Sequence, residues 1–389
     1  MKVAFVVPRY EDGIVGGAET LTRGLAEHLA AAGTPVEVLT TCARSHRTWK
    51  NELRPGVVRE HGVTVLRFPV APRDLDTFGR LQQRIMRGHR LSLEDQQRWV
   101  EESVSSPELY AYLASHRAAY DVTCFAPYLF GLTLEGVRRV EHPVLIPCLH
   151  DEAFAYLDVV RAAFEACRGF IFNSPPEAEL AQKLYGIGDR PWGVVGLGFD
   201  PPPATNPAEF RRRHRLEGAI LLYLGRKEGG KNVPLLIEYV HRYRGTHRQD
   251  LTLVLAGDGP VTVPRGAAGV RDLGYLDARE KADAYAAATV VCQPSVNESF
   301  SIILMEAWQA GVPVLVHARC PVTTYHVFRA HGGLAFGHFY EFAEALTRLL
   351  DDASLRATLG GQGRAYVQTE YAWPAVTGRL TETLERLVG

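Results

Sequence analysis

The chain has 389 residues, which exceeds the size at which one hydrophobic core usually keeps growing, so two domains are expected. Its 43 Lys and Arg residues nearly balance its 44 Asp and Glu residues, which leaves no overall field to attract nucleic acid or acidic lipid. Every apolar run is shorter than a membrane span or a signal-peptide core, and the six cysteines include no C-x-x-C pair. We therefore expect a cytoplasmic protein, at most peripheral to the inner face of the membrane, without a nucleic-acid partner.

The first half of the chain alternates between short apolar runs and helical stretches. Residues 3–7 form a β-branched run, Gly16-Gly17 follows, and a helical stretch over 18–32 ends at Gly33, a residue type that closes helices. Further strands are predicted at 36–39, 63–68, 122–125, 144–148, 170–172 and 194–195. Strands that are apolar on both faces and separated by helices predict a parallel sheet covered on both sides.

A proline-rich segment over 196–207 then interrupts the pattern, because it suits neither a helix nor a central strand. The alternation restarts with predicted strands at 220–224, 251–256, 290–292 and 314–317 and helices near 233–244, 279–288 and 300–310. The predicted fold is α/β, with two doubly wound Rossmann-like domains over 1–195 and 196–372. Ligands of such sheets bind at the carboxyl ends of the strands, so we expect the site in the cleft between the domains.

Two glycine loops are candidate phosphate sites. Gly16-Gly17 opens the first helix, where backbone N–H groups are accessible, but its spacing is not the G-x-G-x-x-G of a nicotinamide site. The segment 225–232 nearly matches the P-loop pattern G-x-x-x-x-G-K-[ST], with Asn232 in place of the hydroxyl residue that holds Mg²⁺. We therefore favour a clamp of Arg226 and Lys231 on a diphosphate over an NTPase. The alternative is two solvated surface cations.

Two carboxylates flank the predicted helix start near residue 300. Glu298 lies in the loop and Glu306 inside the helix, so the pair can reach different hydroxyls of one elongated ligand. The amides of residues 299–303 form a helix N-terminus suited to phosphate. The alternative is that Glu298 caps the helix and Glu306 is an exposed helical carboxylate.

Polar residues also follow a predicted strand of the first half. His150-Asp151-Glu152 comes directly after the run 144–148, at the carboxyl end where catalytic groups gather, and no further metal ligands stand at definable spacing. Asp74-Leu75-Asp76 resembles a metal-binding D-x-D, but helix capping explains it better.

An arginine-rich helical stretch follows over 75–102, with Arg80, Arg84 and Arg87 on one face. Contact with an anionic or lipid-linked acceptor, or weak contact with a membrane surface, is one interpretation of this stretch. A solvated face is favoured, because acidic and Gln residues interrupt the run.

Together these motifs resemble the retaining nucleotide-sugar glycosyltransferases of family 4, which have the two-domain GT-B fold. The resemblance spans nearly the whole chain and rests on the order and spacing of its motifs. These motifs are Gly16-Gly17-Ala18-Glu19, His150-Asp151, Gly225-Arg226 with Lys231, Leu255-Ala-Gly-Asp-Gly-Pro260, Glu298-Ser-Phe, Glu306-Ala-Trp and Ala310-Gly-Val-Pro-Val314. The ending, with Tyr371-Ala-Trp373 and a last helix over 373–389, is similar to the family's segment that crosses back onto the first domain.

The resemblance implies a nucleotide-diphosphate sugar as donor and a carbohydrate, lipid-linked or small-molecule acceptor on the first domain. Arg226, Lys231, the backbone at Gly16-Gly17 and the helix start around Ser299, Phe300 and Ser301 would stabilise the departing diphosphate. Glu306 would bind the ribose hydroxyls and Glu298 the sugar hydroxyls, while His150 would act near the anomeric carbon. No metal ion or other cofactor is expected to be essential, because cationic side chains stand in for a metal.

The chain departs from the family pattern at three places. Ser301 and Asn232 replace usual glycines, and Arg319-Cys320-Pro321-Val322 replaces a glycine-rich acidic motif, which leaves the base and sugar of the donor open. Two other functions stay as alternatives: a P-loop-like NTPase, which would need Mg²⁺, and a non-catalytic nucleotide-sugar-binding protein.

Overall fold

The computed structural model describes residues 1–14, 16–247, 250–263 and 267–388. The chain divides into two compact units. Unit 1 comprises Met1–Gly198 together with the segment from Trp373, and unit 2 comprises Phe199–Ala372. The division falls within the proline-rich segment, three residues after the predicted boundary at 195. No helix in the described part of the chain combines the length and apolar character needed to cross a membrane.

Unit 1 is built on a sheet with the strand order β3-β4-β2-β1-β5-β6-β7-β8 within the described residues. The strands are β1 Val3–Val6, β2 Val36–Thr41, β3 Gly56–Glu60, β4 Val63–Phe68, β5 Val122–Phe125, β6 Pro143–Leu145, β7 Gly169–Phe172 and β8 Trp192–Val194. All neighbours pair in parallel except β3 and β4. The predicted parallel sheet is therefore confirmed, with one antiparallel edge strand added.

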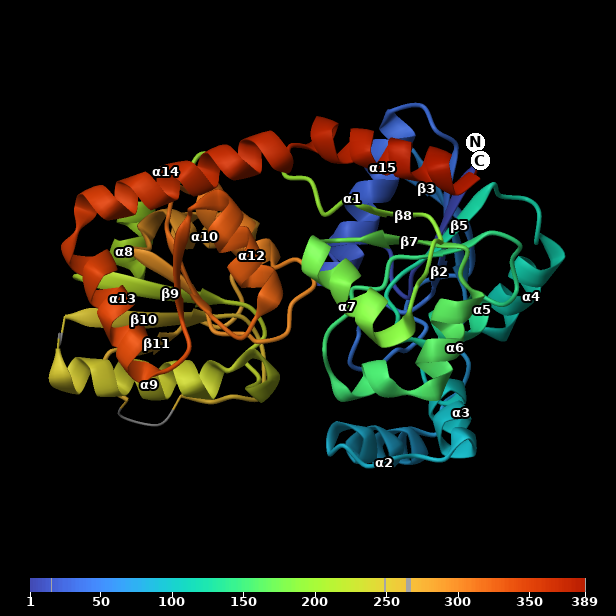
Figure 1. Ribbon diagram of the computed structural model, residues 1–389, viewed down its shortest axis with the longest axis horizontal. Coiled ribbons are helices and arrows are strands. Elements are labelled where there is room, and N and C mark those ends of the chain that lie inside the picture. The colour runs from blue at the N-terminus through green and yellow to red at the C-terminus, as the bar shows by residue number, and fades with distance from the viewer. Residues whose placement is uncertain (15, 248–249, 264–266, 389) are drawn as a thin grey trace. The chain divides into compact units, whose positions relative to one another are not determined.

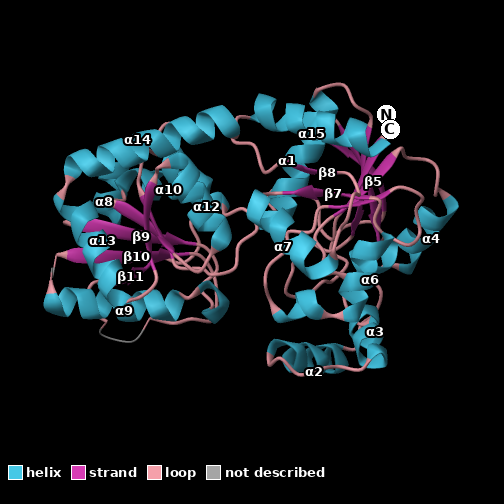
Figure 2. Cartoon of the chain, viewed as in Figure 1, coloured by secondary structure: helices cyan, strands magenta, loops and turns pink. Residues whose placement is uncertain are grey.

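Helices cover both faces of this sheet (Figures 1 and 2). One face carries α2 Leu75–Met86, α3 Leu93–Glu101, α4 Pro107–Ser115, α5 Gly131–Gly136, α6 Asp158–Ala166 and α7 Pro175–Tyr185, with a 3₁₀ turn η1 at Ala153–Tyr156, and their apolar side chains form one core with the strands. The other face carries α1 Gly17–Ala31 and α15 Trp373–Val388. The indole of Trp373 stacks on the ring of His28 with 3.6 Å between ring centroids. A Cβ at Gly24 or Gly198 would clash with this indole, so both glycines make room for the last helix.

Unit 2 has the strand order β11-β10-β9-β12-β13-β14 within the described residues, with all neighbours parallel. Its strands are β9 Ala219–Leu224, β10 Leu251–Ala256, β11 Val270–Asp272, β12 Val290–Gln293, β13 Val314–His317 and β14 Gly333–Phe336. In chain order this is 3-2-1-4-5-6, the order of dinucleotide-binding sheets. The chain reverses its direction of travel between β9 and β12, so their carboxyl ends mark the expected ligand position.

The helices of unit 2 complete the doubly wound arrangement. On one face, α9 Val233–Thr246 and α13 Phe339–Asp351 pack their apolar side chains against the strands. The remaining helices are α8 Pro207–His214, α10 Ala278–Ala287, α11 Ile302–Gln309, α12 Pro321–Ala330 and α14 Ala353–Glu370, with a 3₁₀ turn η2 at Gly229–Lys231. Trp308 of α11 is fully buried, and its indole donates to the carbonyl of Gly332 at 2.8 Å.

Several predicted bounds are wrong by a few residues, each for a local reason. The strand predicted at 144–148 ends at Leu145, and Cys148 has a positive φ of 52°. The helix predicted from residue 300 begins at Ile302, because Ser301 has a φ of 71°. The hairpin of β3 and β4 was not predicted. Its two-residue turn, His61-Gly62, has positive φ at both positions, which suits the right-handed twist of the strands.

Candidate active site

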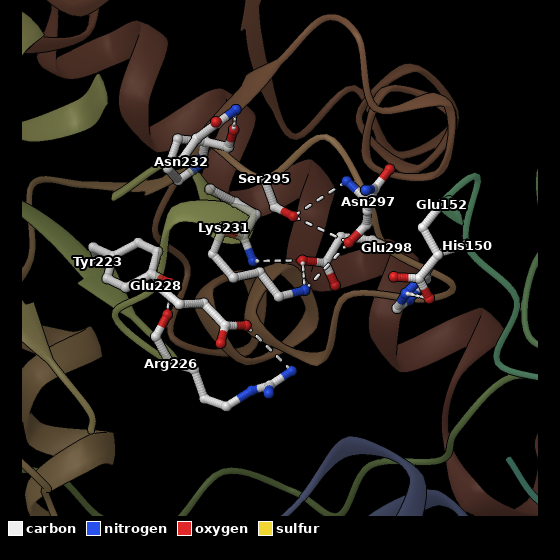
Figure 3. Close-up of polar contacts among 12 residues, drawn as sticks. His150, Glu152, Tyr223, Arg226, Glu228, Lys231, Asn232, Ser295, Asn297 and Glu298 are labelled. Carbon is white, nitrogen blue, oxygen red and sulfur yellow. Dashed lines mark hydrogen bonds and ion pairs between the residues drawn. The ribbon is translucent and has the colours of Figure 1, made fainter. Parts of the chain in front are cut away.

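The reversal point of the unit 2 sheet is lined by two loops, one after β9 and one after β12. The first carries Arg226 and Lys231, and the second carries Glu298 (Figure 3). The structure thus brings together three residues that lie up to 72 positions apart in the sequence and that the resemblance singled out. The carboxyl edge at such a reversal is where ligands of doubly wound sheets bind.

The loop after β9 is held by close backbone contacts with the loop after β10. The N–H of Lys227 donates to the carbonyl of Asp258 at 2.7 Å, and the N–H of Val261 donates to the carbonyl of Lys227 at 3.0 Å. A Cβ at Gly259 would lie 2.2 Å from the carbonyl oxygen of Lys227, so only glycine allows this approach. The buried ammonium of Lys227 is anchored on Asp272, with 2.6 Å from Nζ to each carboxylate oxygen.

Arg226 leaves this rigid loop with its side chain in solvent. Its side chain is 66% exposed and lies near Glu228, at 3.4 Å from Nη2 to Oε1. The carbonyl of Arg226 accepts a hydrogen bond of 2.7 Å from the hydroxyl of Tyr223, which fixes the backbone beneath the guanidinium. A fixed backbone with an exposed guanidinium fits capture of an oxyanion group.

Lys231 and Glu298 form an ion pair with 2.8 Å between Nζ and Oε1. The same ammonium also donates to the carbonyl of Asn297 at 3.2 Å, and the side chains of the pair are 19% and 12% exposed. An ammonium has three N–H donors, so one remains for a ligand. Among the described residues Glu298 accepts through Oε1, and Oε2 is left for a ligand hydroxyl.

Both positions where this chain replaces a usual glycine in unit 2 have left-handed backbone. Asn232 has a φ of 56° and Ser301 a φ of 71°. The amide of Asn232 is used, because its Nδ2 donates to the carbonyl of Pro294 at 3.0 Å and so joins the two loops. The hydroxyl of Ser301 is buried, and no described residue forms a hydrogen bond with it. The alternative that Glu298 caps α11 is wrong, because Ser301 occupies the N-cap position.

Glu306 lies on α11 and is engaged on both oxygens. Its Oε1 pairs with the ammonium of Lys281, and its Oε2 accepts a hydrogen bond of 2.8 Å from the hydroxyl of Tyr285. Its side chain is largely buried, so it is not the exposed helical carboxylate of the alternative. Burial and the neighbouring Glu306 charge raise the pKa of Tyr285 far above its usual value, which keeps this phenol a hydrogen-bond donor.

In unit 1, the predicted loop at Gly16-Gly17 opens α1. A Cβ at Gly16 would lie 2.2 Å from Oε2 of Glu19, so the Glu19 carboxylate folds over this glycine. Arg9, which follows β1 and is buried, holds that carboxylate with 3.0 Å from its Nε to Oε1. Gly17 has open space around its Cα, and its backbone is the accessible part of the loop.

His150 lies in the loop after β6, also in unit 1. Its Nδ1 is 3.6 Å from Oε1 of Glu152, and that same oxygen accepts a hydrogen bond of 2.8 Å from the hydroxyl of Tyr128 (Figure 3). The next residue, Asp151, accepts from the hydroxyl of Tyr156 at 2.7 Å. The imidazole is partly exposed, so a substrate can reach it.

The arginine-rich helix α2 is capped by Asp74, whose side chain accepts from the N–H of Thr77 at 3.0 Å, as predicted. Arg84 pairs with Asp95 at 2.8 Å, and Arg87 lies just beyond the helix end. Within the described residues, no group of three His, Cys, Asp or Glu side chains is placed to hold a metal ion.

Sequence reasoning missed four supporting residues: Arg9, Glu177, Lys227 and Asp272. Each acts through a partner outside its own motif, such as Lys227 with Asp272 across 45 positions. Their only sequence signal was a charged residue close to a glycine or a strand end. The contacts themselves depend on strand order, which single motifs do not encode.

Comparisons with known proteins show which proteins the chain is similar to. Residues 206–366 match the family Glycosyl transferases group 1. The chain is 28% identical over 404 residues to a D-inositol 3-phosphate glycosyltransferase of Kribbella flavida, covering 96% of this chain and 92% of the relative. Among solved structures, it is similar to sucrose-phosphate synthase from Thermosynechococcus elongatus, with a TM-score of 0.71, 20% identity and coverage of 99% and 98%.

It is also similar to the Anabaena protein HepE, solved in complex with UDP and glucose, with a TM-score of 0.70, 16% identity and coverage of 99% of each chain. These likenesses show the GT-B fold, and with the family match they displace the NTPase alternative. Residues 206–366 thus carry the glycosyl transferases group 1 match, and the chain is a retaining, nucleotide-sugar-dependent glycosyltransferase.

Proposed function

We propose that the chain transfers a sugar from a UDP-sugar to a hydroxyl of a small polyhydroxylated acceptor, with unit 2 binding the donor and unit 1 the acceptor. The observation that carries the proposal is the Lys231–Glu298 ion pair beside the exposed Arg226 at the reversal point of the unit 2 sheet. Support for UDP comes from the HepE structure, and support for a small acceptor comes from the inositol phosphate relative.

The two cations have a role in the departure of the diphosphate. Negative charge grows on the leaving group as the bond to the anomeric carbon breaks, and fixed donors aimed at that charge stabilise the transition state. Arg226 supplies an exposed guanidinium and Lys231 its third N–H, while the amides around Ser299, Phe300 and Ser301 supply a helix N-terminus. No metal ion is needed in this scheme, because these groups neutralise the charge.

The two carboxylates of unit 2 then orient the donor. Glu298 accepts from sugar hydroxyls through Oε2, and Glu306 accepts from ribose hydroxyls through lone pairs that Lys281 and Tyr285 leave open. His150 acts near the anomeric carbon, where its partly exposed imidazole stabilises the oxocarbenium-like transition state. The acceptor attacks on the face that the diphosphate leaves, and a β-phosphate oxygen takes the acceptor proton. This route retains the anomeric configuration without a protein nucleophile.

A turnover assay tests the proposal. UDP-glucose and other UDP-sugars are incubated with myo-inositol, inositol phosphates and simple sugar phosphates, in the presence of a chelator, and UDP release and product linkage are followed by NMR. We expect acceptor-dependent UDP release and a product with the donor's anomeric configuration. Donor binding without UDP release for any acceptor in the panel would favour a non-catalytic nucleotide-sugar-binding protein.

A further inference from the structure

The carboxylate of Glu177 lies buried behind the loop that carries His150. Glu177 is the third residue of α7 and is 1% exposed. Its Oε1 accepts from the N–H of Leu149, and its Oε2 accepts from the N–H of Asn173, both at 2.6 Å. Leu149 follows β6 and Asn173 directly follows β7, so one side chain clasps the chain beyond two neighbouring strands.

The surroundings of this carboxylate consist of hydrogen-bond donors. The amide side chain of Asn173 and the backbone of Ser174 also donate toward it. Burial nevertheless raises the pKa of Glu177 to about 8, which measures how unfavourable this position is for a charge. Burying a carboxylate costs free energy unless its oxygens accept hydrogen bonds, and here the oxygens accept hydrogen bonds from backbone N–H groups. A neutral side chain with one acceptor oxygen can satisfy only one of the two clasped amides.

The backbone of the loop 148–150 is strained, so the hydrogen bond to Glu177 helps to keep its conformation. Cys148 has a φ of 52°, a left-handed conformation that costs a non-glycine residue on the order of 1 kcal/mol or more. The thiol of Cys148 accepts a long contact of 3.7 Å from Nδ2 of Asn173. Leu149, whose N–H bonds to Glu177, stands between this strained residue and His150. The orientation of His150 thus depends on a backbone turn that Glu177 holds in place.

We propose that Glu177 is a positioning residue for sugar transfer: its carboxylate fixes the loop 148–150 and thereby the imidazole of His150. This inference rests on the proposed function through the role given to His150. The donor-binding side chains belong to unit 2, whereas Glu177 and the two amides that it binds belong to unit 1. Loss of the clasp therefore lowers kcat and leaves the donor KM unchanged.

Glu177→Gln is the direct test, because it keeps the side-chain volume while its amide nitrogen faces a backbone N–H. Kinetics are measured well above the raised pKa of about 8, so that most of the carboxyl groups are ionised. A displacement of about 1 Å at a catalytic group costs on the order of 10²-fold in rate, so we expect kcat to fall about 10- to 100-fold with the donor KM within about two-fold. Glu177→Asp keeps the charge but reaches only one of the two amides. We expect this second variant to show the same fall in kcat with the donor KM nearly unchanged.

Tyr185→Phe is the matched control. It lies on the same helix α7 and removes one buried hydrogen bond, of 2.7 Å to the carbonyl of Ala155, while both hydrogen bonds of Glu177 remain. We expect this variant to lose some thermal stability and to keep its kcat. A fall in its kcat equal to that of Glu177→Gln would overturn the inference, because any loss of packing at α7 would then suffice.

His150→Ala and the double variant Glu177→Gln/His150→Ala separate the positioning role of Glu177 from the proposed role of His150. If Glu177 acts through His150, the double variant is no slower than His150→Ala alone. A full additional loss in the double variant would overturn the positioning role, as would an unchanged kcat in Glu177→Gln beside a slow His150→Ala. An unchanged kcat in His150→Ala would instead contradict the proposed role of His150 itself, and the positioning role would fall with it.

Discussion

Ser301 combines two unfavourable features, and its replacement by glycine has a calculable effect. Its left-handed backbone costs about 1–2 kcal/mol for an L-residue, and its buried, unpaired hydroxyl costs about 1–3 kcal/mol. Glycine removes both costs but adds about 0.5–1 kcal/mol of chain entropy to the unfolded state. We expect Ser301→Gly to stabilise unit 2 by about 1–4 kcal/mol, which raises Tm by about 2–16 °C for a unit of this size.

Asn232→Gly is the matched comparison for this prediction. Asn232 is also left-handed, but its side chain bonds to the carbonyl of Pro294, and Asn tolerates this conformation better than Ser. Losing that bond costs about 0.5–1.5 kcal/mol, so this variant should be neutral or less stable. Differential scanning calorimetry of both variants checks the pair. A lower Tm for Ser301→Gly would refute the reasoning, since it would mean that the hydroxyl makes a favourable contact.

Three further predictions concern the site and its surroundings. Lys231→Ala should lower kcat about 10²- to 10³-fold in a UDP-release assay, because it removes a donor to the leaving diphosphate, and an unchanged kcat would exclude that role. Glu306→Ala should weaken UDP binding in calorimetry about 10-fold or more, since each hydrogen bond to a charged group contributes about 1.5–3 kcal/mol, whereas equal affinity would remove the ribose assignment. Burial lowers the pKa of His326 to about 3, so the unfolded chain binds a proton more readily. Stability should therefore fall as pH drops from about 6.5 toward 3, by up to about 1.4 kcal/mol per pH unit from this group, and His326→Gln should flatten the denaturation profile over that range.

The sequence was sufficient to predict the parallel sheets and the strand ends that carry the site. A run that is apolar on both faces, such as 251–256, is typical of a buried parallel strand, and β10 has the predicted bounds. The resemblance, and the rule that carboxyl ends of parallel strands share an edge, predicted Lys231 and Glu298 in one site, but their ion pair was not predicted.

Features decided by tertiary contacts were not predictable. The start of α11 moved by two residues because Ser301 takes a left-handed backbone, which glycine usually signals and serine does not. β6 ends at Leu145, and the chain beyond it includes the left-handed Cys148 and the N–H of Leu149 that Glu177 binds. Glu177 itself looks like an ordinary first-turn helix acid in the sequence, and only its burial reveals its bonds to two distant amides.

Calorimetric titration with nucleoside diphosphates and nucleotide sugars, with and without Mg²⁺, tests the central claim most directly. The account predicts metal-independent binding of UDP and its sugars, weakened in Lys231→Ala and Arg226→Ala, which alter the two cations at the reversal point of the unit 2 sheet. Mg²⁺-dependent binding with a preference for ATP or GTP would contradict it.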